Sequence, residues 1–300
     1  MSPTARKIVF LHAVKTGGTT FRNQLAALYG QGFHMCVDAS LSAVQRDLDQ
    51  YDCVELHIRN MPPMGWVCLH AELAAQDRWD LLENRDIFIM FREPVDQILS
   101  NYFYMVSLRA RIEPRMKAIG VAFPESIEDF LDCREHFNNQ TAFVLGKSQQ
   151  GGDVVGPADL AKAKDILQRL KIHVGLTERY DDSVRIFEQV TGNKMPAVPN
   201  ANRTPGRLRV DQISSEIQNR IRERSSLDIE LYRFATELFT QDVERYLGTA
   251  PEALNGSHHP LPQRPKPSLL QPVAVEHVVG IKRNQSLAVR VRNMYARLFN

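Results

Sequence analysis

A buried apolar run that passes directly into a glycine pair and then into an amphipathic helix restricts most strongly how this chain can fold. Residues 8–14 form a short apolar run, which is typical of a fully buried parallel strand. Beyond the loop, Phe21, Leu25 and Leu28 recur at helical spacing. The Gly17-Gly18 pair therefore lies between a strand end and a helix N-terminus, which is the arrangement of an anion-binding loop.

The rest of the chain repeats the alternation of strand and helix. A second strand is predicted over residues 52–58 and a third over 86–91, after which Pro94 begins a helix with an apolar stripe. This alternation predicts an α/β fold with a parallel sheet and helices on both of its faces. The later predicted elements are a helix over 158–170, a strand over 172–176, and helices over 181–190, 211–224 and 228–247.

Composition divides the chain into three parts. We expect one folded domain over residues 1–249, because six of the 16 prolines then fall between residues 251 and 272, as in a linker. The Pro-rich linker is predicted to cover 250–286. Residues 287–300 are basic and amphipathic, so they could form a helix that contacts a membrane surface or a partner. A terminal helix that docks on the domain or frays in solvent is the alternative.

Charge and cysteine content exclude several classes of protein. With 37 basic and 35 acidic residues, the net charge is only +2, which argues against a nucleic-acid partner. No transmembrane stretch and no apolar leader are apparent, so we expect a cytoplasmic, bacterial enzyme. The four cysteines lack metal-ligand spacing and are expected to be buried free thiols, with a Cys53–Cys68 disulfide as the alternative.

The loop between the first strand and the first helix has the chemistry of an anion site. Lys15 adds a positive charge, and Thr16, Thr19 and Thr20 add hydroxyl donors. In P-loop kinases and NTPases the lysine follows the glycines. Here the lysine precedes them, which indicates a different class of anion site.

Two segments together resemble a known family. The run His-Ala-Val-Lys-Thr-Gly-Gly-Thr-Thr-Phe over 12–21 resembles the 5′-phosphosulfate loop of sulfotransferases that use 3′-phosphoadenosine 5′-phosphosulfate (PAPS), above all the carbohydrate type that includes the heparan-sulfate and uronyl 2-O-sulfotransferases. The run over 91–102, with Arg92 at a strand end and Ser100 on the next helix, resembles that family's 3′-phosphate motif. The resemblance implies a P-loop-like, sulfotransferase-type sheet and donor contacts from Lys15, Thr16, Gly17, Gly18, Thr19, Thr20, Arg92, Ser100 and Arg203.

Weaker similarities extend the resemblance over residues 7–247. They are the segments 138–141, 174–180, 202–203 and 228–232. The loop that holds Arg203 closes over the nucleotide in the family, and Arg207 is a weaker candidate for the same contact. Two departures are Val14, where the family usually has proline, and Gln97, where it often has a second arginine. Gln97 puts a salt bridge or a substrate contact in doubt.

Sulfuryl transfer needs in-line geometry, charge stabilisation and a base. Lys15 would neutralise the oxygen that leaves, and no metal is required because lysine, arginine and a helix dipole supply the positive charge. His57 is our candidate base, since it ends the second strand and resembles the family's histidine, with Glu55 as a lesser candidate. His12 is expected to make a structural hydrogen bond. His258 and His259 have no third metal ligand in register.

The acceptor is the least constrained part of the prediction. The resemblance implies a hydroxylated acceptor, a glycan or a small molecule, bound by loops over 61–79 and 109–123. In the second loop Arg109, Arg111, Arg115 and Lys117 could meet an acidic glycan or form a solvated helix face. Two alternatives to a sulfotransferase are a magnesium-dependent small-molecule kinase and a non-enzymatic domain that presents the basic C-terminal helix.

Overall fold

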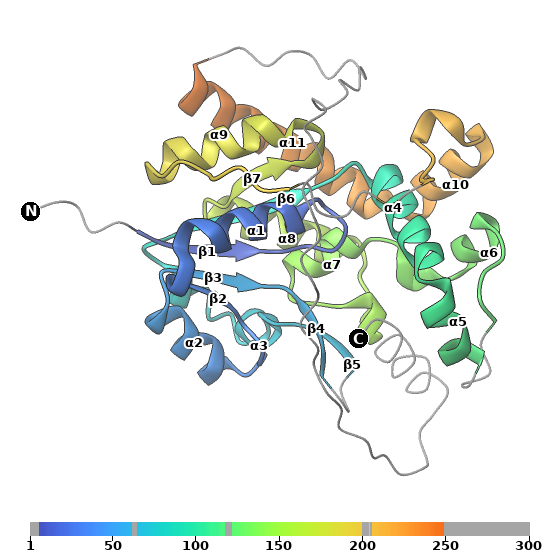
Figure 1. Ribbon diagram of the computed structural model, residues 1–300, viewed down its shortest axis with the longest axis horizontal. Helices are drawn as coiled ribbons and strands as arrows, with labels where there is room; N and C mark the ends of the chain where they lie inside the picture. Colours follow the sequence, from blue (N-terminus) through green and yellow to red (C-terminus); the bar gives the residue numbers. More distant parts are fainter. Residues whose placement is uncertain (1–5, 62–64, 118–121, 200–203, 205, 249–300) are drawn as a thin grey trace, which may run out of the picture.

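A five-stranded parallel sheet forms the centre of the protein (Figure 1). The computed structural model describes residues 6–61, 65–117, 122–199, 204 and 206–248. The strand order is β2-β3-β1-β6-β7, and each neighbouring pair is parallel. The strands are β1 (Lys7–Leu11), β2 (Phe33–Met35), β3 (Cys53–Leu56), β6 (Arg85–Phe91) and β7 (His173–Leu176).

The order of the strands reverses at β1. From β1 the chain adds β2 and β3 on one side, and then returns to place β6 and β7 on the other side. Open parallel sheets bind ligands beyond the carboxyl ends of their strands at such a reversal. The loop after β1 therefore lies where a ligand site is expected.

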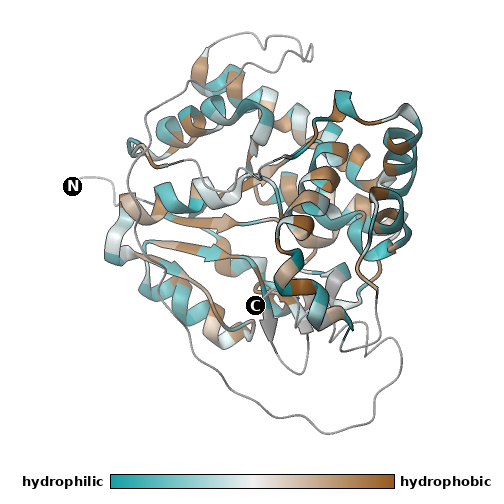
Figure 2. Ribbon diagram, turned by 45° about the vertical axis from the view of Figure 1, so that its right-hand side comes forward, coloured by the Kyte–Doolittle hydropathy of each residue, from teal (hydrophilic) through white to brown (hydrophobic). Residues whose placement is uncertain are grey.

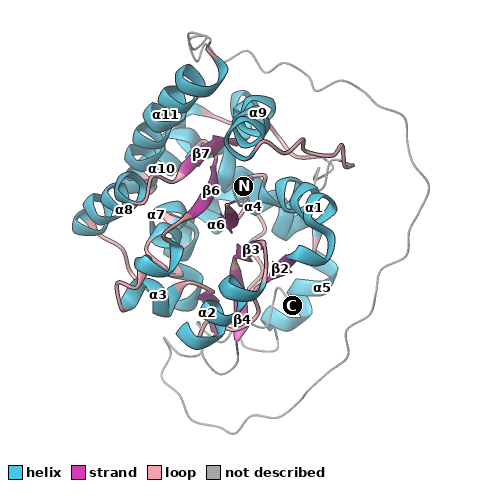
Figure 3. Ribbon diagram, turned by 90° about the vertical axis from the view of Figure 1, so that its left-hand side faces the viewer, coloured by secondary structure: helices cyan, strands magenta, loops and turns pink. Residues whose placement is uncertain are grey.

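Helices cover both faces of the sheet, as predicted (Figure 3). Successive side chains of a strand point to opposite faces, so Ile8 and Phe10 pack on one side of β1, and Val9 and Leu11 on the other. The first face is covered by α1 (Gly18–Tyr29) and α9 (Tyr180–Thr191). The second is covered by α2 (Leu41–Gln50), α3 (Ala71–Ala75), α7 (Asn139–Val144), α8 (Pro157–Arg169) and α11 (Ser226–Leu247).

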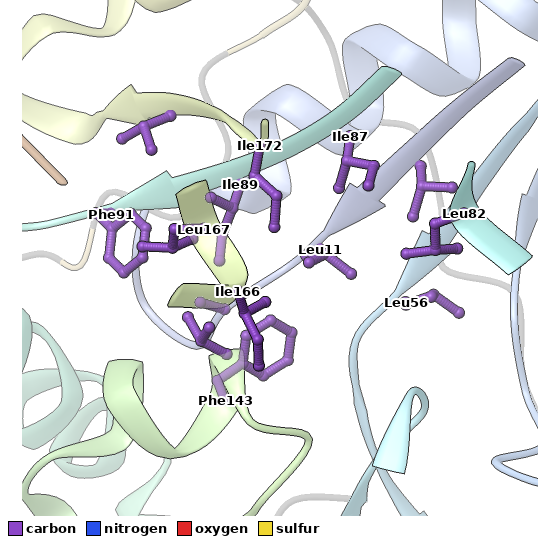
Figure 4. Close-up of a cluster of buried hydrophobic side chains, with 14 of the residues drawn as sticks. Leu11, Leu56, Leu82, Ile87, Ile89, Phe91, Phe143, Ile166, Leu167 and Ile172 are labelled. Atoms are coloured by element: carbon purple, nitrogen blue, oxygen red, sulfur yellow. The ribbon is translucent and has the colours of Figure 1, made fainter. Parts of the chain in front are cut away.

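The larger of the two cores lies under this second face (Figure 4). Leu11 of β1, Ile87, Ile89 and Phe91 of β6, and Leu167 of α8 all belong to this core. In Figure 2 each surrounding helix carries both hydrophobic (brown) and hydrophilic (teal) residues, as an amphipathic helix does. Burial on both faces explains why the central strands have near-continuous apolar sequences.

A group of helices packs beyond the carboxyl edge of the sheet, with a core of its own. It consists of α4 (Pro94–Ser107), α5 (Arg109–Lys117), α6 (Ile127–Asp132) and α10 (Ser215–Arg224). Helix α4 begins with Pro94, and the side chain of Glu93 accepts a hydrogen bond from Asp96 N as its N-cap. Because α4 follows β6 directly, its first turns lie beside the loop after β1.

Both segments predicted as acceptor loops contain regular structure, so that prediction is wrong in part. The segment 61–79 includes β5 (Gly65–Cys68), which pairs antiparallel with β4 (Ile58–Met61), and also α3. The segment 109–123 begins with α5. The alternative of a helix face at Arg109 to Lys117 is realised in α5, which includes Pro114. The remaining short 3₁₀ helices are η1 (Gly30–Gly32), η2 (Trp79–Leu82), η3 (Arg134–His136), η4 (Gln149–Gly151), η5 (Thr177–Arg179) and η6 (Val210–Gln212).

The four cysteines are free thiols, so the alternative of a Cys53–Cys68 disulfide is not realised. Cys53 lies on β3, and Cys68 donates to the backbone oxygen of Lys147 instead. Within the described residues, no helix is long and apolar enough to cross a bilayer. The predicted linker over 250–286 and the predicted helix over 287–300 lie outside the described residues.

Candidate active site

The loop after β1 presents the start of α1 without a protein cap. Gly17 is the N-cap, with φ 77°, and its helix has neither a side-chain cap nor an acidic residue in its first turn. Lys15 also has a positive φ, 60°, which is uncommon for a residue with a side chain. Uncapped backbone N–H groups at the positive end of a helix dipole attract an anion.

Gly18 lies against the ring of His12, so this position cannot carry a side chain without displacement. A Cβ atom there would lie 2.2 Å from His12 Cδ2. His12 is 4% exposed, and a buried hydrogen bond joins its Nδ1 to Glu55. The close approach keeps the first turn of α1 against the sheet edge.

The threonines of the loop serve its own structure. Thr16 is buried and donates through Oγ1 to the oxygen of Ala13 at 3.0 Å. The oxygen of Thr16 accepts from Thr177 Oγ1 at 2.7 Å, and the same hydroxyl lies 3.0 Å from the oxygen of Phe91. Thr20 is also buried, and Thr19 is half-buried. Thr177, at the end of β7, thus ties the loop to the neighbouring strand β6.

Two arginines share one carboxylate beside the loop, and Lys15 lies near both of them. Arg92 donates from Nε to Asp96 Oδ2 at 2.7 Å and from Nη1 to the backbone oxygen of Lys15 at 3.2 Å. Arg207 donates to Asp96 Oδ1. Its Nε is buried and has no hydrogen-bond partner among the described residues. A buried donor without a partner is costly, so the cluster is electrostatically prepared for an additional anion.

Burial lowers the pKa values of all three cations, and repulsion between cations adds to the shift for Lys15 and Arg207. Burial, Arg92 and Arg207 lower the pKa of Lys15 to about 8. Burial and Arg92 lower the pKa of Arg207 to about 10, and burial lowers the pKa of Arg92. Each shift means that the site disfavours its own positive charge. A bound anion would reverse that preference.

Two further carboxylates lie near Arg92 but bond elsewhere. Glu93 accepts from the backbone of Asp96 at 2.8 Å. Glu178 accepts from the backbone of Glu93 at 2.9 Å and from the hydroxyl of Tyr232 at 3.0 Å. They reduce the positive potential behind Arg92, whereas Lys15 makes no hydrogen bond or ion pair with any residue that the structure describes.

Gln97 and Ser100 lie on the part of α4 that faces the site. Gln97 is 4% exposed and donates from Nε2 to the oxygen of Val14 at 2.7 Å. The two departures from the family pattern therefore contact each other, and Gln97 supports the loop through the backbone. Ser100 is buried two turns into α4.

The segments 138–141 and 228–232, which carry two of the weaker sequence similarities, are hydrogen-bonded to each other, and the first also bonds to the backbone of Arg92. Gln140 accepts from Arg92 N at 3.0 Å and donates to Arg92 O at 2.9 Å, which fixes this backbone on both sides. Asp228 in turn accepts from the backbone of Gln140 and from the backbone and hydroxyl of Thr141. Burial raises the pKa of Asp228 to about 6. These contacts explain why both segments accompany the arginine motif.

His57 follows β3 directly at the carboxyl edge of the sheet. Its Nδ1 is hydrogen-bonded to the backbone oxygen of His12, and the two imidazole rings stack with centroids 4.1 Å apart. A carbonyl only accepts, so Nδ1 carries the proton and Nε2 is left as the basic nitrogen. Burial and His12 lower the pKa of His57 to about 3, which keeps the ring neutral near pH 7.

The other candidate residues take different places. Glu55 is 2% exposed and bonded to His12, which makes the expected structural hydrogen bond. Arg109 is held by Glu113 and Glu125. Arg203, His258 and His259 lie outside the described residues. In the part of the chain that the structure describes, no three His, Cys, Asp or Glu side chains are grouped to hold a metal ion.

The structure thus brings together Lys15, the loop threonines and glycines, Arg92 and Ser100, which the sequence predicted. It adds Asp96, Arg207, Thr177 and Gln140 to the site. The sequence contained weak signals for Arg207, Thr177 and Gln140. Asp96 lies inside the arginine motif, but the sequence predicted no role for it. A carboxylate at an anion site is unexpected, and its role is apparent only when the structure shows its contacts with Arg92 and Arg207.

Comparison with known proteins agrees with the fold. The chain is similar to the heparan-sulfate 6-O-sulfotransferase 3-B of Danio rerio, with 25% identity over an alignment of 278 residues that covers 78% of this chain. The alignment spans 64% of the relative's length. No protein-family model matches the chain. The distant similarity supports a sulfotransferase in general terms, and the parallel sheet is consistent with a sulfotransferase-type fold. The 2-O subtype suggested by the sequence stays a prediction.

Replacing Gly18 by alanine should distort the loop. The added methyl would overlap the His12 ring, which Glu55 and His57 hold in place, so we expect Gly18→Ala to lower the free energy of unfolding by about 1–3 kcal/mol. Chemical denaturation followed by circular dichroism measures this change.

Gly156→Ala is the matched control, because nothing lies within 4 Å of a Cβ atom at Gly156. We expect it to cost less than about 1 kcal/mol at its N-cap position. Equal stability of Gly18→Ala and the wild-type protein would show that His12 does not constrain the loop.

Proposed function

We propose that this protein is a PAPS-dependent sulfotransferase that transfers a sulfuryl group to a hydroxyl acceptor. The observation that carries the proposal is the cation cluster at an uncapped helix N-terminus: Arg92 and Arg207 share the carboxylate of Asp96, and Lys15 lies close enough to both arginines to feel their charge. The distant similarity to a protein named as a sulfotransferase supports the same class. The position of Lys15 before the glycines favours it over the kinase alternative.

The donor would occupy two anion sites. Its 5′-phosphosulfate would lie on the N-terminus of α1, with Lys15 and residues 16–20 around it. Its 3′-phosphate would lie near Arg92 and Ser100, with Arg203 as an additional contact. Arg92 already uses Nε for Asp96, so the phosphate would take the N–H groups that remain on its two terminal nitrogens.

The reaction is an in-line displacement at sulfur. The acceptor oxygen forms a bond to sulfur while the bond from sulfur to the 5′-phosphate oxygen breaks. Lys15 would neutralise the negative charge that develops on that phosphate oxygen. Nε2 of His57 would take the hydroxyl proton, because Nδ1 is committed to the oxygen of His12. For this, the anionic donor would have to raise the pKa of the ring from about 3, the value to which burial and His12 lower it.

A carbohydrate hydroxyl is the acceptor class that we propose. The support is the name of the relative, which acts on heparan sulfate, and the resemblance of the two donor motifs to carbohydrate-type enzymes. Arg109 supports it less than expected, because Glu113 and Glu125 already neutralise its charge. A screen of hydroxylated acceptors with labelled donor tests this part separately.

Donor binding should depend on the two basic residues of the site. We expect adenosine 3′,5′-bisphosphate (PAP), the product of the donor, to bind in titration calorimetry without added metal. Lys15→Ala and Arg92→Ala should each weaken binding by about tenfold or more, because each removes a charge-assisted hydrogen bond.

Arg78→Ala is the matched control, since Arg78 pairs with Asp80 on the surface and carries the same charge. Its affinity for PAP should stay within about twofold of the wild-type value at physiological salt. Absence of PAP binding by folded wild-type protein would contradict the proposed function. An equal loss in Arg78→Ala would show that binding depends only on overall charge.

The role of His57 is tested by turnover at saturating donor. We expect His57→Ala to lower kcat by about 10²–10⁴-fold while PAP affinity is unchanged, because the base acts on the acceptor proton and not on the donor. His34→Ala, at a histidine that stacks on Tyr51, should leave kcat unchanged. Near-normal kcat in His57→Ala would transfer the role to Glu55.

A further inference from the structure

Lys15 is fixed at its backbone, so the position of its ammonium group depends on what the side chain touches. Its φ of 60° and the hydrogen bond from Arg92 Nη1 to its oxygen hold the main chain. No carboxylate or carbonyl among the described residues accepts from Nζ. A long, flexible lysine side chain without a partner would otherwise sample many rotamers.

One face of α4 follows the loop. Gln97, Asn101 and Tyr104 are spaced i, i+4 and i+7, and therefore lie along one side of the helix. Gln97 bonds to the oxygen of Val14. Asn101 lines a cavity of about 10 Å³ with Lys15 and Gln97, room for roughly one water-sized group. The next residue on this face is Tyr104.

The ammonium group of Lys15 makes a cation–π contact with the ring of Tyr104. Nζ of Lys15 lies 3.9 Å from the centre of the Tyr104 ring. Both side chains are half-buried, so the contact is partly shielded from water. An ammonium over an aromatic face is attracted by the ring quadrupole, and the attraction grows as water is removed. Tyr102 and Phe103 instead pack edge to face against each other.

The charged groups around Lys15 oppose its protonation. Arg92 and Arg207 both lower its pKa, and the carboxylate of Asp96 is bonded to those two arginines. His136 lines the same cavity and is neutral near pH 7, since burial lowers its pKa to about 3. The ring of Tyr104 is therefore the one described group in direct contact that stabilises the lysine cation.

We propose that Tyr104 is a positioning residue for Lys15: its ring holds the ammonium group in its charged form beside the loop, where a donor anion can meet it. This role rests on the proposed function of the loop as the donor site. The ring stabilises the lysine cation equally with and without the donor, so it sets the fraction of the protein that is charged and ready to bind at a given pH.

The ionisation of Lys15 in the ligand-free protein tests the contact directly. Trace acylation at a series of pH values, read at the Lys15 peptide by mass spectrometry, gives its pKa, expected at about 8. Tyr104→Leu should lower that pKa by about half to one unit, because the cation loses its aromatic partner. Tyr104→Phe keeps the ring and should stay within about 0.2 units.

Phe103→Leu is the matched control, as it removes the neighbouring ring of α4 that does not contact Lys15. Tyr104→Met serves if Tyr104→Leu fails to fold, and it should shift the pKa in the same direction. An unchanged pKa of Lys15 in Tyr104→Leu and in Tyr104→Met would overturn the proposal. An equal shift in Tyr104→Phe or in Phe103→Leu would also overturn it.

PAP affinity separates this role from a merely structural one. At about pH 8.5 the fraction of charged Lys15 falls, so Tyr104→Leu should bind PAP about three- to eightfold more weakly than wild type. At about pH 6.5, where both proteins are charged, the affinities should agree within about twofold. A loss that is equal at both pH values would contradict the proposal. Wild-type protein that binds no PAP yet shows the pKa shift would contradict the donor site alone.

Discussion

The carboxylate of Asp96 between Arg92 and Arg207 is the interaction on which the site depends. It joins the end of β6, the first turn of α4 and the segment around Arg207, and through Arg92 it reaches the backbone of Lys15. Asp96 is bonded to both arginines, so it leaves Lys15 without an ion pair among the described residues. Burial, and after it repulsion by Arg92 and Arg207, lowers the pKa of Lys15.

The surrounding structure serves to keep that arrangement rigid. Thr177 supports the loop from β7, Gln97 supports it from α4, and Gln140 fixes the backbone of Arg92. Asp228 of α11 holds Gln140 in turn. Donors that are already oriented need not reorganise when charge develops, which is how polar sites stabilise transition states. Parallel strands make this possible, because their carboxyl ends deliver all these residues to one edge.

Sequence patterns predicted the parallel sheet, its flanking helices and the positions of Lys15, Arg92 and Ser100, because apolar periodicity and local loop chemistry are short-range signals. The hairpin of β4 and β5 was missed, since the sequence predicted a single strand over 52–58 and tertiary packing decided otherwise. The helical alternative for residues 109–117 is realised in α5. The sequence placed Tyr104 only on the helix predicted to begin at Pro94. Its contact with Lys15 joins residues far apart in the chain, and no single-sequence pattern encodes such a pairing.

The central claim is that the cation cluster and the N-terminus of α1 form one donor site. A crystal structure of the protein with PAP tests this most directly. The account predicts the 5′-phosphate within about 2.7–3.2 Å of the backbone N–H groups of the loop and of Lys15 Nζ, with the 3′-phosphate at Arg92 and Ser100. PAP bound elsewhere, away from the N-terminus of α1 and from Lys15 Nζ, would contradict it.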